Sequence, residues 1–198
     1  MNLVERVKNI ILKPKQEWNV IDTEAAQTID LYKSYVIPLA AIGPIAALIG
    51  TTLIGISLPG VGTYRVPLGS AIGQMIVVYI LSLIGVYVMA LIIDFLAPSF
   101  SGEKNTNQAL KVAVYSSTAS WLGGVFGLIP ILGFISIIAS LYSLYLLYLG
   151  LPVLMKSPKE KALIYTVVIV IAAIIIFVVI GLISSVFISL PTPNVLNK

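Results

Sequence analysis

Residues 162–190, ALIYTVVIVIAAIIIFVVIGLISSVFISL, decide the class of fold, because this stretch contains no charged side chain and no proline. A helix needs about 20 apolar residues to cross the hydrocarbon core of a bilayer. The stretch exceeds that length, and as a helix it would be apolar on every side, which is typical of a helix surrounded by lipid or protein. We therefore predict that it crosses a membrane.

The composition extends this prediction to the whole chain. Hydrophobic residues make up 59% of the 198 residues and charged residues only 10%, whereas a soluble domain usually carries about 25% charged residues. We expect an all-α, polytopic membrane helix bundle with five transmembrane helices. The predicted spans are residues 35–58, 66–97, 110–129, 131–155 and 162–190.

The third and fourth spans are joined by an uncharged turn at residues 128–133, Leu-Ile-Pro-Ile-Leu-Gly. Two helices of about 20 residues leave only a short turn between them. The pair either crosses the membrane fully as a tight hairpin or dips in and returns. The chain exits on the side it entered in both cases, so the orientation of the fifth span is unaffected.

The basic residues predict the orientation. Of the twelve lysines and arginines, all except Arg65 and Lys198 precede the first span or lie near the second-to-third or fourth-to-fifth connections. Cytoplasmic loops carry the excess of Lys and Arg, so the N-terminus is expected inside the cell and the C-terminus outside. The chain then divides into a cytoplasmic N-terminal segment (1–34), a five-helix domain (35–190) and an extracytoplasmic tail (191–198). We expect a multi-pass protein of the plasma or inner membrane.

Two residue types are absent, and their absence limits the chemistry. The chain has no cysteine and no histidine, which excludes disulfides and thiolate sites and removes the commonest general base and metal ligand. The net charge of +4 does not indicate nucleic acid binding, because the basic residues are spread between apolar runs. We expect no catalytic residue, no metal and no cofactor.

The N-terminal segment begins with a predicted basic amphipathic helix. At about 100° per residue its apolar side chains fall within one arc, and Lys13-Pro14 ends it, because a residue before proline disfavours the helical conformation. The helix is expected to lie on the inner membrane surface or to pack on the protein's own helix ends. The two arrangements are compatible with each other. Trp18 is either an interfacial anchor or a cytoplasmic core residue. The arc comprises Leu3, Val4, Val7, Ile10 and Ile11.

Two connections carry signals for helix starts. Ser157-Pro158-Lys159-Glu160 combines a capping serine, a proline in the first turn and a following glutamate. Asn105-Thr106-Asn107-Gln108 is a weaker version of the same pattern.

Asp94 is the only carboxylate embedded at the end of a predicted span. Because it lies near a helix C-terminus, where the helix dipole disfavours negative charge, we expect a basic partner. Lys104, Lys111 or a basic residue of the N-terminal segment would serve. Intramembrane acids are often ion or substrate sites, but the position at the edge of the span favours a structural salt bridge.

The third and fourth spans hold the densest group of polar side chains. In an antiparallel hairpin centred on Pro130, Tyr115 is expected to meet Tyr145, and Thr118 to meet Tyr142. Trp121 is expected to lie deep in the membrane, so its N–H needs a partner. Hydrogen-bonded packing of the two helices is the favoured interpretation, and a small polar cavity is the alternative.

Recognisable motifs are spread along nearly the whole chain. They are Lys13-Pro14-Lys15-Gln16-Glu17-Trp18, Ala109-Leu110-Lys111-Val112-Ala113-Val114-Tyr115-Ser116, Trp121 with residues 128–133, and Tyr148-Leu149-Gly150-Leu151-Pro152-Val153-Leu154 leading to Lys161-Ala162. Together these motifs resemble the Ypt/Rab-interacting-protein (Yip) family, in its prokaryotic branch. Asp30-Leu31-Tyr32 resembles the start of the Asp-Leu-Tyr-Gly-Pro motif of eukaryotic members, but Lys33-Ser34 break it, and Ala119 stands where many relatives have proline.

The resemblance implies five spans with a cytoplasmic N-terminus, in agreement with the independent charge count. Eukaryotic members bind Rab GTPases, but a Rab-type GTPase is not expected here, because the match is prokaryotic and the cytoplasmic segment is short. The resemblance leaves the role of prokaryotic members undefined.

Two functions remain in view. The first is a non-enzymatic membrane scaffold or interaction protein, whose partners are the lipid bilayer and a homo-oligomer or other membrane proteins. The second is a small solute or ion transporter or channel using Asp94 and the polar side chains of the third and fourth spans. The candidate structural or interaction residues are Trp18, Asp30, Tyr32, Asp94, Lys111, Tyr115, Ser116, Thr118, Trp121, Tyr142 and Tyr145.

Overall fold

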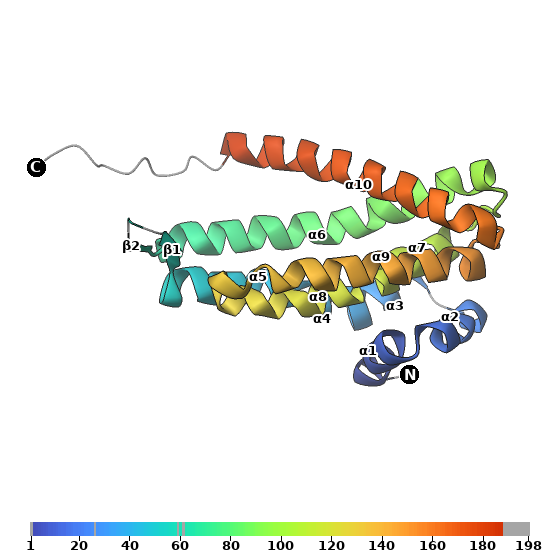
Figure 1. Cartoon of the computed structure of the whole chain (residues 1–198), viewed down its shortest axis with the longest axis horizontal. Helices are drawn as coiled ribbons and strands as arrows, with labels where there is room; N and C mark the ends of the chain where they lie inside the picture. Colours follow the sequence, from blue (N-terminus) through green and yellow to red (C-terminus); the bar gives the residue numbers. More distant parts are fainter. Residues whose placement is uncertain (1, 26, 59, 61, 188–198) are drawn as a thin grey trace, which may run out of the picture.

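The computed structural model describes residues 2–25, 27–58, 60 and 62–187. Long helices run side by side along one axis, and two short N-terminal helices lie against one end of this bundle (Figure 1). The predicted tail (191–198) and residues 188–190 of the predicted fifth span lie outside the described residues.

The N-terminal helical pair consists of α1 (Leu3–Leu12) and α2 (Pro14–Thr23). The side chain of Asn2 accepts a hydrogen bond from the Val4 amide and so caps the start of α1. Pro14 is the first residue of α2, where its missing N–H is tolerated. The predicted end of the first helix at Lys13-Pro14 is confirmed, and a second helix follows without a loop.

The first long apolar helix is irregular. It comprises α3 (Thr28–Leu31), a π-helical turn (Tyr32–Val36), α4 (Ile37–Ala40), α5 (Ile42–Ile49) and a second π-helical turn (Gly50–Ile54). It begins before the predicted residue 35 and ends at Gly55, whose φ of 87° is a left-handed conformation that favours glycine. The predicted end at residue 58 was wrong, because β1 (Ile56–Leu58) pairs with β2 (Gly62–Tyr64) in an antiparallel hairpin.

The remaining helices follow the predicted order. The predicted second span is α6 (Leu68–Leu96), extended by a 3₁₀ turn (Ala97–Phe100). The predicted third span is divided into α7 (Thr106–Ser116), α8 (Thr118–Gly123) and a 3₁₀ helix, η4 (Gly124–Leu128). A short turn, η5 (Pro130–Leu132), leads to α9 (Ile135–Leu154), and α10 (Lys159–Phe187) follows.

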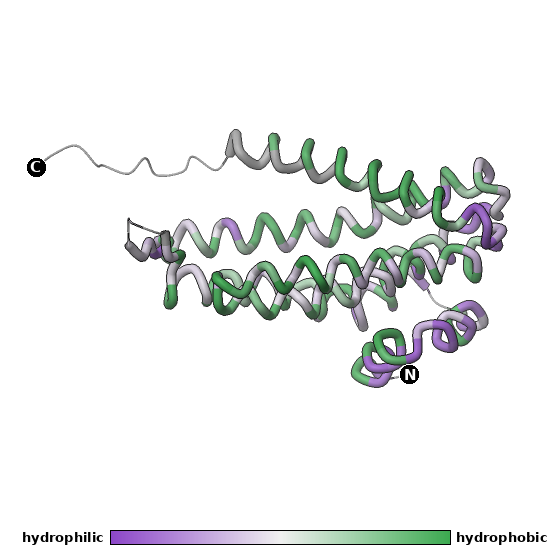
Figure 2. The backbone as a smooth tube through the Cα atoms, viewed as in Figure 1, coloured by the Kyte–Doolittle hydropathy of each residue, from purple (hydrophilic) through white to green (hydrophobic). Residues whose placement is uncertain are grey.

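Three helices of the described chain are long and apolar enough to cross a membrane: Thr28–Ile54, Leu68–Phe100 and Ile135–Leu154. Apolar residues make up most of the long helices, while hydrophilic residues gather on the N-terminal helical pair and the adjoining loops (Figure 2). The all-α membrane class is therefore supported. The number of five spans stays a prediction.

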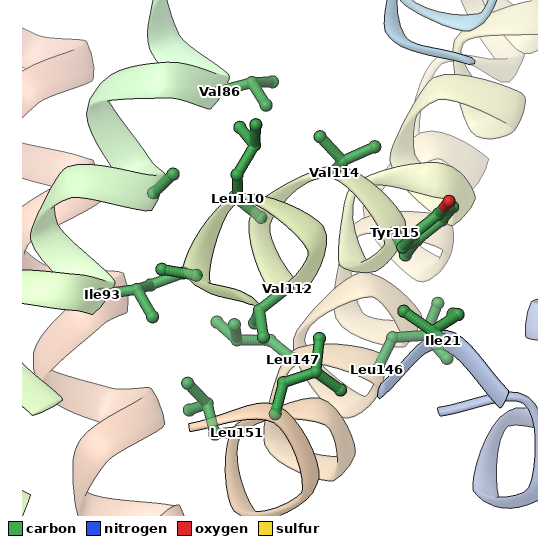
Figure 3. Packing of buried hydrophobic residues seen from close by; sticks show 14 of the residues in the cluster. Ile21, Val86, Ile93, Leu110, Val112, Val114, Tyr115, Leu146, Leu147 and Leu151 are labelled. Atoms are coloured by element: carbon green, nitrogen blue, oxygen red, sulfur yellow. The ribbon is translucent and has the colours of Figure 1, made fainter. Parts of the chain in front are cut away.

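The core is centred on α7. Every residue of α7 from Ala109 to Ser116 is buried, which is what a helix surrounded by other helices requires. Figure 3 shows Val112 of α7 among side chains of α9, with Ile93 of α6 on one side and Ile21 of α2 on the other. The N-terminal helical pair is thus part of the core and not an appendage.

Candidate functional site

The contact between the N-terminal helical pair and the bundle is built around a buried arginine. Arg6 is only 4% exposed. Its Nη1 donates to Glu17 Oε1 at 2.5 Å, and its Nη2 donates to both carboxylate oxygens of Glu24. A buried charge is tolerated when it is paired and hydrogen-bonded, and both carboxylates come from α2 or the residue after it. The turn at Lys13-Pro14 folds α2 back on α1 and brings these groups together.

The environment of Arg6 keeps it charged. Burial lowers the pKa of its guanidinium, but the hydrogen bond to Glu24 and the electrostatic interactions with Tyr115, Glu24 and Glu17 raise it, and the net pKa lies above its usual value. Breaking such a pair leaves an uncompensated charge, at a cost of about 3–5 kcal/mol. The network of Arg6, Glu17 and Glu24, called the latch below, therefore holds α1 and α2 in one arrangement.

Lys111 attaches the latch to the bundle. Lys111 is a residue of α7. Its Nζ donates to the carbonyl oxygens of Ile21 at 2.9 Å and Glu24 at 2.5 Å. These carbonyls end α2, where a helix leaves unpaired acceptors and where a cation is favoured by the dipole. The expectation that Lys111 pairs with Asp94 was wrong, because Lys111 is used to cap α2.

A cluster of aromatic rings continues from the latch into the bundle. The Arg6 guanidinium lies 5.4 Å from the centre of the Tyr115 ring. Tyr115 packs edge-on against Trp18, with ring centres 6.4 Å apart, and against Tyr35 at 4.8 Å. Tyr35 in turn lies 6.4 Å from Trp121. The ring contacts connect the helical pair to the first long helix, α7 and α8.

Trp18 is a core residue, which was one of the two predicted alternatives. It is 0% exposed, and its ring lies against Gly150 of α9, where an added Cβ would come within 2.8 Å of it. Its Nε1 is buried and has no hydrogen-bond partner in the described part of the chain. The alternative of an interfacial anchor was wrong, because no part of the Trp18 side chain is exposed.

Three further contacts fasten the helical pair. The Tyr142 hydroxyl donates to the Ile11 carbonyl at 2.6 Å. Lys156 Nζ lies 2.6 Å from Asp22 Oδ2, and Gln108 Nε2 donates to Asp22 Oδ1 at 2.9 Å. Both helices of the pair are thus bonded to α7, α9 or the segment following α9.

The amphipathic arc of α1 is divided between protein and exterior. Ile10 is fully buried, and Leu3, Val7 and Ile11 are partly buried against the core, whereas Val4 is 71% exposed. Packing on the protein's own helices is therefore confirmed. Contact of the remaining arc with a membrane surface stays a prediction.

Asp94 has a neutral partner instead of the predicted basic one. Its Oδ2 accepts from the Thr106 hydroxyl at 2.8 Å, and its Oδ1 is buried without a hydrogen-bond partner among the described residues. Lys104, another of the expected partners, lies over the ring of Phe95, 5.8 Å from its centre. No ion pair of Asp94 occurs within residues 2–187 as described.

Asp30 and Tyr32 do not meet each other. Tyr32 donates its hydroxyl to the Leu83 carbonyl of α6 at 2.8 Å. Asp30 is exposed and borders a cavity of about 190 Å³ that Arg6 and Glu24 also line. The two residues belong to different contacts.

The third and fourth segments do pack against each other, but other residues pair than those predicted. Ser120 Oγ donates to Ser143 Oγ at 2.8 Å, and Ser136 Oγ donates to the Gly123 carbonyl at 2.8 Å. Thr118 is bonded to Tyr35 at 2.9 Å, which contradicts its predicted pairing with Tyr142.

The tyrosine pair predicted for this hairpin was also wrong. Tyr115 faces the latch, while Tyr145 is 41% exposed with its ring against Tyr142. The bent third segment turns Tyr115 and Thr118 toward the first helix instead of toward α9.

Ser116 and Trp121 border a cavity of about 490 Å³ between α6, α7, α8, α9 and α10, called the serine-lined cavity below. The hydroxyl donors of Ser116, Ser117 and Ser120 are already bonded to other protein atoms. Trp121 lines this cavity, and its ring lies 6.4 Å from that of Tyr35. The wall contains no Asp, Glu, Lys or Arg among the described residues. The predicted alternative of a small polar cavity is thus present beside the hydrogen-bonded packing.

Sequence reasoning missed Arg6, Glu17, Glu24 and Tyr35. The charges of an amphipathic helix are normally solvated, so nothing in the spacing identified Arg6 as buried. In the described residues no group of three or more acidic side chains could hold a metal ion.

Comparisons with known proteins extend these observations. The model of the Yip1 domain family matches residues 8–181. The inner membrane protein YohC of Escherichia coli strain K12 is 27% identical over 166 residues, which cover 82% of this chain and 85% of that protein. YohC of Escherichia coli O6:H1 strain CFT073 gives the same figures. No solved structure matches this chain.

Proposed function

Since this chain belongs to the Yip1 domain family, we propose that it is a non-enzymatic scaffold of the inner membrane that presents its N-terminal helical pair to other membrane proteins or to a second copy. The name of the relative YohC, an inner membrane protein, supports this location. The bilayer is the first partner, because the described chain contains three helices that are apolar and long enough to cross it.

The observation that carries the proposal is the buried latch. Ordering α1 and α2 costs conformational entropy, and the chain offsets that cost with the pairs of Arg6 with Glu17 and Glu24. A segment that only tethered the chain to lipid would not need a fixed arrangement. Fixed helices with an exposed outer face, including Val4 and Leu12 at 71% and 65% exposure, suit recognition of a partner.

We also propose five spans with the N-terminus in the cytoplasm. The three long helices account for the first, second and fourth spans. The segment from α7 to η4 (106–128) and the 29-residue α10 supply the other two in this proposal. The division into residues 1–34, 35–190 and 191–198 follows from it.

The scaffold proposal is tested by crosslinking in the membrane. A photoreactive amino acid at Val4, on the exposed face of α1, is expected to give a discrete adduct with a second copy or another membrane protein. Glu17→Gln leaves Arg6 with one carboxylate fewer, so the adduct should fall roughly fivefold or more as α1 loses its fixed position. Glu5→Gln, an exposed charge on the same helix, is the matched control and should leave the adduct unchanged. Equal adduct yields from all three forms, or lipid adducts alone, contradict the proposal.

The serine-lined cavity favours transport as the second candidate function. A cavity of about 490 Å³ can hold a small solute. Coupled transport, however, uses an ionisable or coordinating group near the middle of the membrane, and the cavity wall has none among the described residues. Asp94 lies outside that wall and is bonded to Thr106.

Flux measurements separate the two functions. Liposomes containing the parent protein are expected to show no solute or ion flux above empty liposomes, and Asp94→Asn should lower thermal stability without changing flux, because it weakens the bond with Thr106. Substantial flux in the parent that vanishes in folded Asp94→Asn would promote the transporter.

A further inference from the structure

A separate cavity of about 530 Å³ lies between α2 and α9 at the end of the bundle that carries the N-terminal helical pair. Its polar lining comes from three elements: Lys15 and Asn19 of α2, Tyr145 and Tyr148 of α9, and Lys159 at the start of α10. The buried ring of Trp18 contributes to its wall. This cavity is called the lysine cavity below.

The charge of the lysine cavity is not compensated by the protein. Within the described residues, neither the Lys15 nor the Lys159 ammonium group forms an ion pair or a hydrogen bond, and the described lining contains no carboxylate. Two other lysines of the same end do have partners, since Lys156 pairs with Asp22 and Lys161 donates to Ser101. Two free ammonium groups around one cavity attract an anion.

The neighbouring surface of α9 is suited to an apolar tail. Leu141 and Leu144 precede Tyr145 and Tyr148 by four residues each, so each leucine lies one turn along the same face as a tyrosine. Leu141 is 60% exposed and Leu144 is 37% exposed. The tyrosines, at 41% and 36% exposure, stand between this apolar surface and the lysines. Tyrosines at such a boundary are typical of the membrane–water interface.

We propose that the lysine cavity binds the headgroup of an anionic phospholipid. The phosphate lies between Lys15 and Lys159, the hydroxyls of Tyr145 and Tyr148 donate to it, and the acyl chains follow Leu141 and Leu144. The amphiphilic arrangement is the reason to assign a lipid in place of soluble phosphate, which would gain nothing from the exposed leucines. The site does not depend on the scaffold function.

The test uses the full-length protein in a neutral detergent, where no membrane surface potential attracts lysines in general. Native mass spectrometry measures retention of added phosphatidylglycerol, with phosphatidylcholine and inorganic phosphate as separate probes. Replacing both cavity lysines, Lys15→Gln with Lys159→Gln, removes two charges that have no protein partner, so folding should be intact, as checked by thermal unfolding. The matched control, Lys8→Gln with Lys13→Gln, removes two exposed charges of the N-terminal segment outside the cavity.

We expect the cavity variant to retain phosphatidylglycerol roughly 25-fold more weakly than the parent, since each of the two lysines near a bound anionic lipid contributes about fivefold. The control variant should stay within twofold of the parent, as a rough bound for charges outside the cavity. Phosphatidylcholine should bind no better to the parent than to the cavity variant. Equal losses in both variants would overturn the site. Inorganic phosphate that displaces the lipid and stabilises the protein equally well would overturn the assignment of a lipid.

Discussion

Trp18 depends on a single glycine for its place in the core. At Gly150 an added Cβ would come within 2.8, 2.9 and 3.0 Å of three atoms of the indole ring. Contacts this short force the ring or the helix to move, because protein interiors are closely packed. Gly150 therefore lets α9 approach α2 closely enough for Trp18 to be fully buried.

Gly150→Ala is expected to loosen the N-terminal helical pair. Overpacking lowers the free energy of unfolding by about 1–3 kcal/mol. The higher helix propensity of alanine offsets about 0.5–1 kcal/mol of this loss. The measured result should be a lower unfolding temperature and faster proteolysis within residues 3–23. Adding Trp18→Phe removes the ring atoms that clash, so the double variant should resist the protease better than Gly150→Ala alone. A double variant that is weaker than both single variants contradicts the clash.

The hydrogen-bond partners of individual polar residues were predicted correctly in some cases and wrongly in others, for physical reasons. Asn105 caps α7, as its side chain accepts from the Gln108 amide at 3.1 Å. Ser157 does not cap α10, which begins at Lys159, and its hydroxyl is buried without a partner among the described residues. The Asn105 cap uses only nearby backbone and could be predicted, whereas the stronger pattern at Ser157 failed. The partners of Arg6 and Asp94 depend on how distant segments fold together.

At the scale of elements, the long helices were predictable and their irregularities were not. Runs of apolar residues identified α6, α9 and α10 to within a few residues. The two π-helical turns, the 3₁₀ helix η4 and the β-hairpin follow from packing and local backbone geometry instead. One cause is identifiable, since glycines of the second π-helical turn (Gly50–Ile54) and of α5 meet glycines of η4.

This glycine contact brings two backbones together. A Cβ at Gly50 would lie 2.1 Å from the Gly127 carbonyl oxygen, and one at Gly124 would lie 2.6 Å from the Gly43 Cα. Backbone atoms cannot move aside as a flexible side chain can. The contact fixes the first helix against the bent third segment and explains why that segment is not a regular α-helix near its end.

Gly50→Ala is expected to destabilise the bundle strongly. An overpacked contact of this kind costs about 3 kcal/mol, which lowers the unfolding temperature by roughly 6–12 °C for a chain of this size. Gly73→Ala is the matched control, because a Cβ at Gly73 meets nothing within 4 Å. Thermal unfolding in detergent should show no loss for the control. Similar unfolding temperatures for both variants would contradict the close backbone approach.

At the scale of the whole molecule, the structure gathers most of the charge at one end. The N-terminal helical pair and the connections that precede α7 and α10 lie together, and the β-hairpin lies at the opposite end (Figure 1). The charge pattern of the sequence predicted this separation, but it did not predict that the helical pair would be buried against the bundle. Burial required the latch, whose members are separated by up to 18 residues in the sequence.

The separation of charge leads to a prediction of topology. The native chain has no cysteine, so single cysteines are clean reporters of each end. Thr63→Cys lies in the exposed strand β2 and Asn107→Cys in the exposed first turn of α7. Gly62 is the poorer position in the hairpin, because its φ of 110° strains any residue with a side chain.

An impermeant thiol reagent added to intact cells is expected to label Thr63→Cys and to leave Asn107→Cys unlabelled until the membrane is permeabilised. The reason is the excess of basic residues at the end that carries Asn107, which the positive-inside rule assigns to the cytoplasm. Labelling of both positions after permeabilisation confirms that each thiol is accessible. If only Asn107→Cys is labelled in intact cells, the orientation is reversed. The N-terminal helical pair would then face outward, and no cytoplasmic partner could reach it.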